Sequence, residues 1–313
     1  MKKFILSHGL LAVITAVAFT SCNDNDDVIP ETGKTIVELV VETNEFSILE
    51  AAVVRAGLVE TLSADGPFTV FAPTNDAFRA AGFADEASLQ AVPVETLQSI
   101  LLYHVLASSA TASSIPSATN TEIETVGGSD VYVTKSNAGV FVNGGKVTQA
   151  DVMATNGVIH VIDKVLMPPM GDVVETLAGN SDFSLLVAAV VRASQGTVNV
   201  KEALEGDGPL TVFAPTNQAF MDAGFATAEA IQAADPATLT SILTYHVVAG
   251  QVFSNSLTDG MNAATLNGGD LTFSLGGGAA VKGSGNATAS KITGADMVVD
   301  NGVIHIIDQV LLP

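Results

Sequence analysis

The second half of this chain repeats the first half, block by block and in the same order. Pro67–Ala84 and Pro209–Ala226 share 14 identical residues in 18. Asn156–Asp163 matches Asn301–Asp308 at seven of eight positions, the exception being a valine replaced by isoleucine. Self-similarity at a regular spacing is the mark of a duplicated structural unit. The sequence therefore predicts two copies of one fold rather than a single large domain.

The spacing of the repeated blocks sets the domain borders. We expect the first domain at residues 34–168 and the second at residues 171–313, each long enough to bury its own core. The joint between them, Pro168–Gly171, is only a few residues long. A joint of this length leaves little freedom, so we expect the two domains to touch.

Each copy has a helical first part and a strand-rich second part. Apolar residues of 36–53 and of 95–105 follow helical spacing. Thr69–Ala72 reads as a buried strand, followed by a short helix over 76–81. From Val131 onward apolar and polar residues alternate, with Asn- and Gly-rich turns between the runs. This order predicts an α+β domain.

Composition excludes several classes of function. The chain has 33 acidic and 12 basic residues and a net charge of −21, which argues against nucleic acid as a partner. Its one cysteine permits no internal disulfide and no multi-thiolate zinc site. No phosphate-binding loop, dinucleotide fingerprint or nucleophile elbow is present. We expect no catalytic residues, no metal and no cofactor.

The N-terminus resembles a bacterial lipoprotein signal. Lys2 and Lys3 precede an apolar run that ends at Phe19, which is too short to span a membrane. The only cysteine, Cys22, follows small residues directly after this run. We therefore predict a signal peptide at residues 1–21 and lipid attachment at Cys22. The alternative is ordinary cleavage after Ala18, which would leave Cys22 as a free thiol.

Residues 22–33 read as an acidic tether between this anchor and the first domain. Three aspartates within 23–27 would be repelled by an anionic membrane, so the lipid would be the only membrane contact. The acidic run also resembles the signal that directs some bacterial lipoproteins to the outer surface. We expect export and lipid anchoring in the bacterial envelope, at the outer membrane and on its exposed side.

The repeated blocks resemble the fasciclin-like domain family. The resemblance rests on Thr-Val-Phe-Ala-Pro-Thr-Asn-x-Ala-Phe, on a Tyr-His pair, and on Asn-Gly-Val-Ile-His-x-Ile-Asp, all in order in both copies. It covers nearly all of residues 34–313. It implies a β-wedge or sandwich with packed helices, a place in secreted or cell-surface adhesion proteins, and no catalytic residues.

The resemblance also implies candidate partner-binding residues. The Tyr-His pair of the family, implicated in receptor binding in animal adhesion proteins, falls on Tyr103-His104 and Tyr245-His246. A second family contact, an Asp-Ile pair, falls on Asp151 and Asp296, each followed by a residue other than isoleucine. A purely structural role for the Tyr-His pairs, in the core or at a helix end, is the alternative.

Other repeated polar residues point to structure rather than chemistry. His160 and His305 lie within Val-Ile-His-(Val/Ile)-Ile, where a strand would bury a neutral imidazole and bond its nitrogens to the backbone. The aspartate three residues later would lie on the opposite side of the strand, so shared metal ligation is not expected. Helix capping explains the remaining polar residues of the first signature, which are Thr74, Asn75, Thr216 and Asn217.

Three hypotheses of function follow. The first is a lipid-anchored adhesion or protein-interaction module with an unknown protein or glycan partner at the cell surface. The second is a glycan-binding accessory lipoprotein, which the absence of Trp and the presence of only three Tyr disfavour. The third is a hydrolase, for which the sequence offers no recognisable pair of acids.

Overall fold

The computed structural model describes residues 33–313. The predicted signal peptide, the lipid attachment at Cys22 and nearly all of the predicted tether lie outside the described residues. No helix among residues 33–313 combines the length and the apolar character that crossing a membrane requires.

The first domain begins with helices and continues as a meander of strands, as the sequence predicts. Its helices are α1 (Ile36–Glu42), η1 (Asn44–Phe46), α2 (Ser47–Ala56), α3 (Val59–Ser63), α4 (Asn75–Ala80), η2 (Ser88–Ala91) and α5 (Val94–Tyr103). Its strands are β1 (Phe68–Pro73), β2 (Val105–Leu106), β3 (Thr121–Glu124), β4 (Asp130–Ser136), β5 (Gly139–Val142), β6 (Gly145–Ala154) and β7 (Gly157–Ile162).

The second domain repeats this order. Its helices are α6 (Val173–Ala178), η3 (Ser181–Phe183), α7 (Ser184–Ala193), α8 (Val200–Leu204), α9 (Asn217–Asp222), α10 (Ala228–Ala233), α11 (Pro236–Tyr245) and η4 (Ser254–Ser256). Its strands are β8 (Leu210–Pro215), β9 (Val247–Ala249), β10 (Asn262–Ala264), β11 (Asp270–Ser274), β12 (Ala280–Lys282), β13 (Ser290–Val299) and β14 (Gly302–Ile307).

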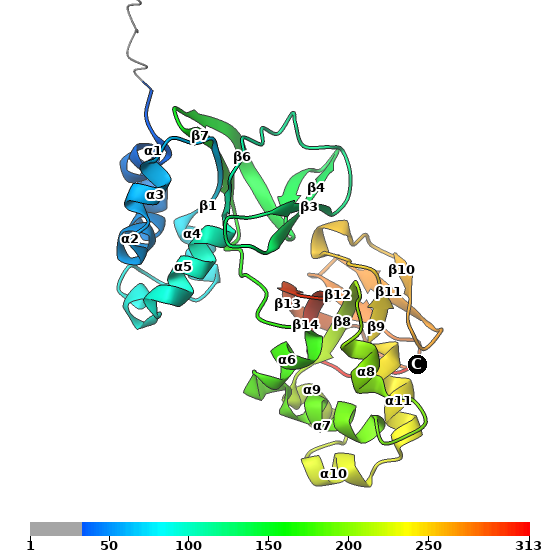
Figure 1. Ribbon diagram of the computed structural model, residues 1–313. Helices are drawn as coiled ribbons and strands as arrows, with labels where there is room; N and C mark the ends of the chain where they lie inside the picture. Colours follow the sequence, from blue (N-terminus) through cyan, green and yellow to red (C-terminus); the bar gives the residue numbers. More distant parts are fainter. Residues whose placement is uncertain (1–32) are drawn as a thin grey trace, which may run out of the picture. The chain divides into compact units, whose positions relative to one another are not determined.

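Each domain contains a seven-stranded sheet. In the first domain the order is β2-β1-β7-β6-β5-β4-β3, with β1 and β7 parallel and every other pair antiparallel. The register of β6 on β7 shifts between Val147 and Gln149 and again between Gln149 and Val152. Bulges of this kind bend a strand. In Figure 1 the helices α1 to α3 lie on one side of β1 and β7, and β3 and β4 lie on the other.

Each domain has two hydrophobic cores, because the side chains of its central strands point alternately to the two faces of the sheet. On β1, Val70 and Ala72 pack with the helices, whereas Phe71 points to the other face. On β7, Ile159 and Val161 join the helical core while Ile162 joins Phe71. Because side chains alternate between the faces of a strand, one apolar run supplies both cores. The α+β prediction is confirmed.

One predicted helix ends earlier than expected. Helical spacing suggests a helix that runs to Val105, but α5 stops at Tyr103 with His104 as its C-cap. Val105 instead pairs with Val70 of β1 as the start of β2. An apolar pattern alone does not distinguish the last turn of a helix from a following buried strand. Sheet pairing decided the border.

Candidate functional site

The Tyr-His pair of the first domain lies in its interior. Tyr103 and His104 are both buried. The Tyr103 hydroxyl donates to the carbonyl oxygen of Asp130 at 2.8 Å and accepts from the Asn143 amide at 2.9 Å. His104 donates from Nδ1 to the Ile100 carbonyl at 2.7 Å and accepts the Leu166 N–H at Nε2. Neither ring is placed to touch a partner directly.

The second copy has the same arrangement. The Tyr245 hydroxyl donates to the carbonyl of Asp270, and His246 bonds the Ile242 carbonyl and the Leu311 N–H. Burial lowers the pKa of His104 and of His246 to about 4, although the backbone carbonyl acts in the opposite direction. Both imidazoles are therefore neutral near pH 7. Their contacts fasten the end of a helix to the C-terminal segment of the domain.

The capping residues divide into two roles. Thr74 and Thr216 are the N-caps of α4 and α9, as predicted. Asn75, in contrast, does not cap its own helix: its Oδ1 accepts the N–H of Ile48 at 3.0 Å in the first turn of α2. Asn217 makes the equivalent bond to Leu185. Each asparagine thus accepts a backbone N–H in the first turn of a helix that lies some thirty residues earlier in the chain. The N–H groups of a first turn have no partner within their own helix.

His160 and His305 are buried and bonded only to backbone. His160 donates from Nε2 to the Ala110 carbonyl at 2.7 Å and accepts the Asp151 N–H at Nδ1. His305 bonds the Val252 carbonyl and the Asp296 N–H in the same way. The structure thus agrees with the prediction that each imidazole is buried and bonds one backbone carbonyl and one backbone N–H. Each histidine therefore connects a loop, through the carbonyl of Ala110 or Val252, to the β-bulge that contains Asp151 or Asp296.

The two aspartates stand at equivalent bulges but in different surroundings. Both have positive φ, 57° at Asp151 and 61° at Asp296. Asp151 is exposed, and its carboxylate accepts the Ala112 N–H at 2.8 Å. Asp296 is buried, and its carboxylate accepts both the N–H and the hydroxyl of Ser254, at 2.6 and 2.5 Å.

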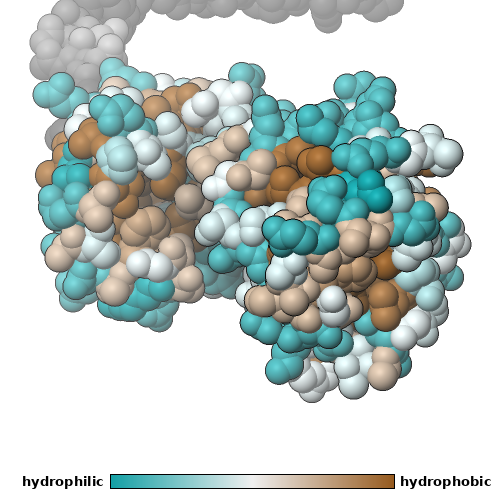
Figure 2. Space-filling view, turned by 90° about the horizontal axis from the view of Figure 1, so that it is seen from below, coloured by the Kyte–Doolittle hydropathy of each residue, from teal (hydrophilic) through white to brown (hydrophobic). Residues whose placement is uncertain are grey.

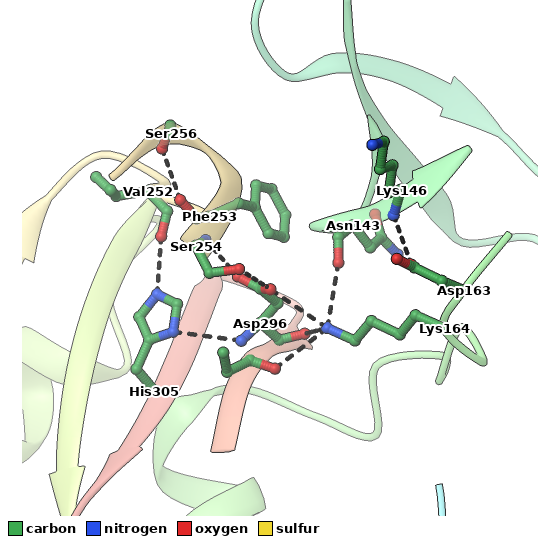
Figure 3. Close-up of polar contacts among 11 residues, drawn as sticks. Asn143, Lys146, Asp163, Lys164, Val252, Phe253, Ser254, Ser256, Asp296 and His305 are labelled. Carbon is green, nitrogen blue, oxygen red and sulfur yellow. Dashed lines mark hydrogen bonds and ion pairs between the residues drawn. The ribbon is translucent and has the colours of Figure 1, made fainter. Parts of the chain in front are cut away.

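Asp296 is buried because the first domain covers it (Figure 3). The Lys164 ammonium lies 3.4 Å from the Asp296 carboxylate and also donates to the carbonyls of Ala295 and Asp296, at 3.1 and 3.4 Å. A fourth bond runs to the carbonyl of Asn143 in its own domain, at 3.3 Å. Burial lowers the pKa of Lys164, and the Asp296 carboxylate acts in the opposite direction. The predicted contact between the domains is present.

Apolar and backbone contacts complete this junction. The rings of Tyr132 and Phe253 lie 5.9 Å apart, and Asn120 donates to the Gln251 carbonyl at 2.7 Å. Gly144 has φ +77°, and a Cβ there would come within 2.2 Å of the Asp296 carboxylate. Only glycine permits both this backbone conformation and this approach.

The sequence predicted that the two domains touch, but it did not identify the residues of the first domain that form this junction. It singled out residues that recur in both copies, whereas the residues of the first domain that make the contact do not recur. Gln309 stands in the second copy where the first has Lys164. The available signal was this difference between two otherwise matching segments.

A second surface feature lies among the helices of the first domain. An apolar groove of about 110 Å³ is lined by residues of α1, α2 and α3 and reaches down to β1 and the end of α5. At its rim Val41 is 51% exposed and Val54 is 61% exposed. Figure 2 shows hydrophobic side chains interspersed with hydrophilic ones on the face that it draws. Nothing in the described part of the chain occupies this groove.

Residues 33–313 also contain no group of three or more His, Cys, Asp or Glu side chains that could hold a metal ion.

Comparison with known proteins agrees with this architecture. The family model described as the fasciclin domain matches twice, at residues 44–168 and 181–313. The chain belongs to the fasciclin family. A solved fasciclin domain pair, from the insect cell adhesion molecule fasciclin I, aligns with 88% of this chain and 96% of its own, at 19% identity and a TM-score of 0.42.

Curated relatives come from bacteria and animals. Protein sll1483 of Synechocystis is 46% identical over 142 residues, covering 45% of this chain and 77% of its own. Transforming growth factor-beta-induced protein ig-h3 of Sus scrofa is 36% identical over 53% of this chain and 24% of its own. Human periostin is 34% identical over 56% and 20%. This fasciclin chain thus spans about a quarter or less of the two animal relatives.

Proposed function

We propose that this protein is a non-catalytic adhesion or protein-interaction module that a lipid on Cys22 anchors to the bacterial envelope, on the outer membrane. Its two fasciclin domains act as a joined pair that presents its surface to a protein partner. The observation that carries the proposal is that the polar side chains repeated in both copies are engaged in hydrogen bonds within the domains. The four histidines His104, His160, His246 and His305 each bond two backbone groups.

Side chains fixed in this way support a structural role for the signatures and leave recognition to the surface. A general base or a nucleophile needs a free lone pair or a group within reach of a substrate. Both ring nitrogens of each buried histidine already bond a backbone group, so no histidine nitrogen is left to act on a substrate.

The tyrosines argue against the glycan-binding alternative. Sugar platforms use exposed aromatic rings, and the chain has three Tyr and no Trp. Tyr103 and Tyr245 are buried, and Tyr132 packs on Phe253. Among the described tyrosines, two rings are thus buried and the third, half-buried, packs against Phe253, which disfavours a platform for sugar stacking.

Anchoring is tested with Cys22→Ala, compared with Ser21→Ala as the neighbouring control. We expect Cys22→Ala to move the protein from the membrane fraction to the soluble fraction in folded form, whereas the Ser21→Ala protein stays with the membrane. Protease treatment of intact cells then reports exposure. A Cys22→Ala protein that remains in the membrane fraction would refute the lipid anchor.

A further inference from the structure

The groove among the helices of the first domain has an apolar mouth. One exposed valine from each helix stands there: Val41 of α1 is 51% exposed, Val54 of α2 is 61% exposed and Val59 of α3 is 36% exposed. The buried side chains of Val70 and Leu101 line the groove below them. Single exposed apolar residues are ordinary on a protein surface, whereas a group of them around one cavity marks a site of interaction.

The second domain has a groove at the same place but with a different mouth. This groove is lined by residues of α6, α7 and α8 and the residue that follows α8. The repeat puts Ala178 where the first copy has Val41, and Lys201 where it has Val59. Lys201 forms an ion pair with Glu205 at 3.1 Å, and both residues line the second groove. The fold therefore does not require valines at these positions, and the apolar mouth distinguishes the first domain.

The helices around the first groove carry an excess of acidic residues. Residues 36–63 contain five acidic residues and one basic residue, against three and two in residues 173–204. The one base, Arg55, bonds backbone carbonyls elsewhere in the domain. Glu50 lines the groove, Glu60 lies in α3, and no ion pair in the described part of the chain involves either. These carboxylates favour a cationic partner and repel an anionic lipid surface.

The groove offers few hydrogen-bonding groups to a ligand. Its polar lining residues are Glu50 and His104, and both ring nitrogens of His104 already bond backbone groups. Of the strands that reach it, β1 is paired on both sides, and the Val105 carbonyl of β2 accepts the N–H of Val126. An extended peptide would leave its own backbone groups without partners here, whereas a helix bonds them internally.

The volume of the groove limits what can enter it. The groove holds about 110 Å³. A cavity of roughly 150 Å³ accommodates one benzene ring. One aliphatic side chain the size of leucine therefore enters the groove, and the rest of the partner lies on the valines at its mouth.

We propose that the groove of the first domain binds an amphipathic helix of a partner protein. The helix inserts one leucine-sized side chain among the three valines and places lysines or arginines against Glu50 and Glu60, which is recognition of a helix in a groove. Charge complementarity and the apolar mouth found in one copy of the fold carry this inference. It rests on the proposed interaction role and deepens it by naming the class of partner.

The test uses a synthetic peptide as the probe. The peptide has about 15 residues, chiefly Ala and Lys, with leucines at helical spacing on one face and a fluorescent label. The full chain with Cys22→Ala is titrated into it, so that no lipid is present, and anisotropy reports binding. Val41→Thr combined with Val54→Thr should weaken binding about tenfold or more, because each places a hydroxyl where a methyl group met the peptide. Val191→Thr, at the matching position of the second groove, should leave binding unchanged.

The charges are tested in the same way. Glu50→Gln combined with Glu60→Gln should weaken binding about threefold or more at low salt, and high salt should weaken it in the parent chain. Glu202→Gln, which removes the charge equivalent to Glu60 from the second copy, should have no effect. A peptide with glutamates in place of its lysines should bind about tenfold or more weakly.

Four results would overturn the inference. The first is no binding of the lysine peptide at about 1 mM of cooperatively folded chain. The second is binding that the valine variants do not weaken, and the third is equal binding of the glutamate peptide. The fourth is Val54-dependent sedimentation of the chain with phosphatidylglycerol vesicles, which would make the groove a lipid site.

Folding and anchoring are measured separately from peptide binding. If the double valine variant does not melt cooperatively, Val54→Thr alone replaces it, with weaker binding again expected and unchanged binding again overturning the inference. Membrane fractionation of cells with and without Cys22→Ala still reports the lipid anchor when the peptide does not bind. A failure of this inference is therefore distinguishable from a failure of the proposed function.

Discussion

Asp151 and Asp296 occupy the same bulge of two copies of one domain, with φ values of 57° and 61°, but only Asp296 is buried and paired with a lysine. The pair lets one substitution be compared in two environments. Asp296→Ala removes the partner of Lys164 and leaves the N–H and hydroxyl of Ser254 without their acceptor. Asp151→Ala removes one hydrogen bond at an exposed site.

We therefore expect Asp296→Ala to lower the free energy of unfolding by about 2–4 kcal/mol, because it leaves buried donors unpaired. Asp151→Ala should lower it by about 1 kcal/mol or less. Urea denaturation of both variants measures the difference. Equal losses would mean that the contact between the domains contributes nothing to stability.

Gly144→Ala should loosen the junction specifically. Gly144 and Gly128 both have positive φ, so alanine costs about 1–2 kcal/mol at either position. Only at Gly144 would the new Cβ collide with Asp296, while at Gly128 it meets no atom within 4 Å. Calorimetry should show two separated unfolding transitions for Gly144→Ala and the parental profile, shifted to lower temperature, for Gly128→Ala. Identical profiles for the two variants would contradict the close approach at the junction.

His160→Ala should destabilise the first domain by about 2–4 kcal/mol. The substitution opens a cavity beside Phe71, whose ring stacks on the imidazole at 5.7 Å, and it leaves the Ala110 carbonyl unpaired. Any loss of binding should follow the loss of folded protein in thermal melts. If His160→Ala melted like the parent while losing a ligand or a metal, a binding role would replace the structural one.

Stability should fall as the pH drops from about 6.5 to 4. The pKa of His104 and of His246 is about 4 in the folded protein against 6.5 for the unperturbed side chain, so only the unfolded chain takes up protons in this range. Folding is then favoured above pH 6.5 and loses on the order of 3 kcal/mol per histidine by pH 4. Burial also lowers the pKa of His305, which acts in the same direction.

Urea melts at several pH values measure this slope. His104→Asn should be less stable than the parent at pH 7 but should lose less stability on acidification. A slope that His104→Asn leaves unchanged would assign the acid sensitivity to other groups.

The sequence by itself determined the two-copy organisation, the α+β order within each copy and the backbone hydrogen bonds of the buried His160. These features depend on local pattern: apolar periodicity sets helix and strand, and a histidine within Val-Ile-His-Val-Ile of a buried strand has only backbone groups to bond. Thr74 as an N-cap is local in the same sense, since its hydroxyl accepts the N–H of Ala77 three residues later.

Only the tertiary structure decided what the non-local side chains do. Asn75 bonds Ile48 across 27 residues, and Lys164 reaches Asp296 across 132. The end of α5 was set by pairing of Val105 with β1 rather than by helix propensity. Identical motifs in the two copies cannot reveal that one aspartate is covered and the other open. That difference depends on which domain follows which, because burial is a property of neighbours in space and not of the residue itself.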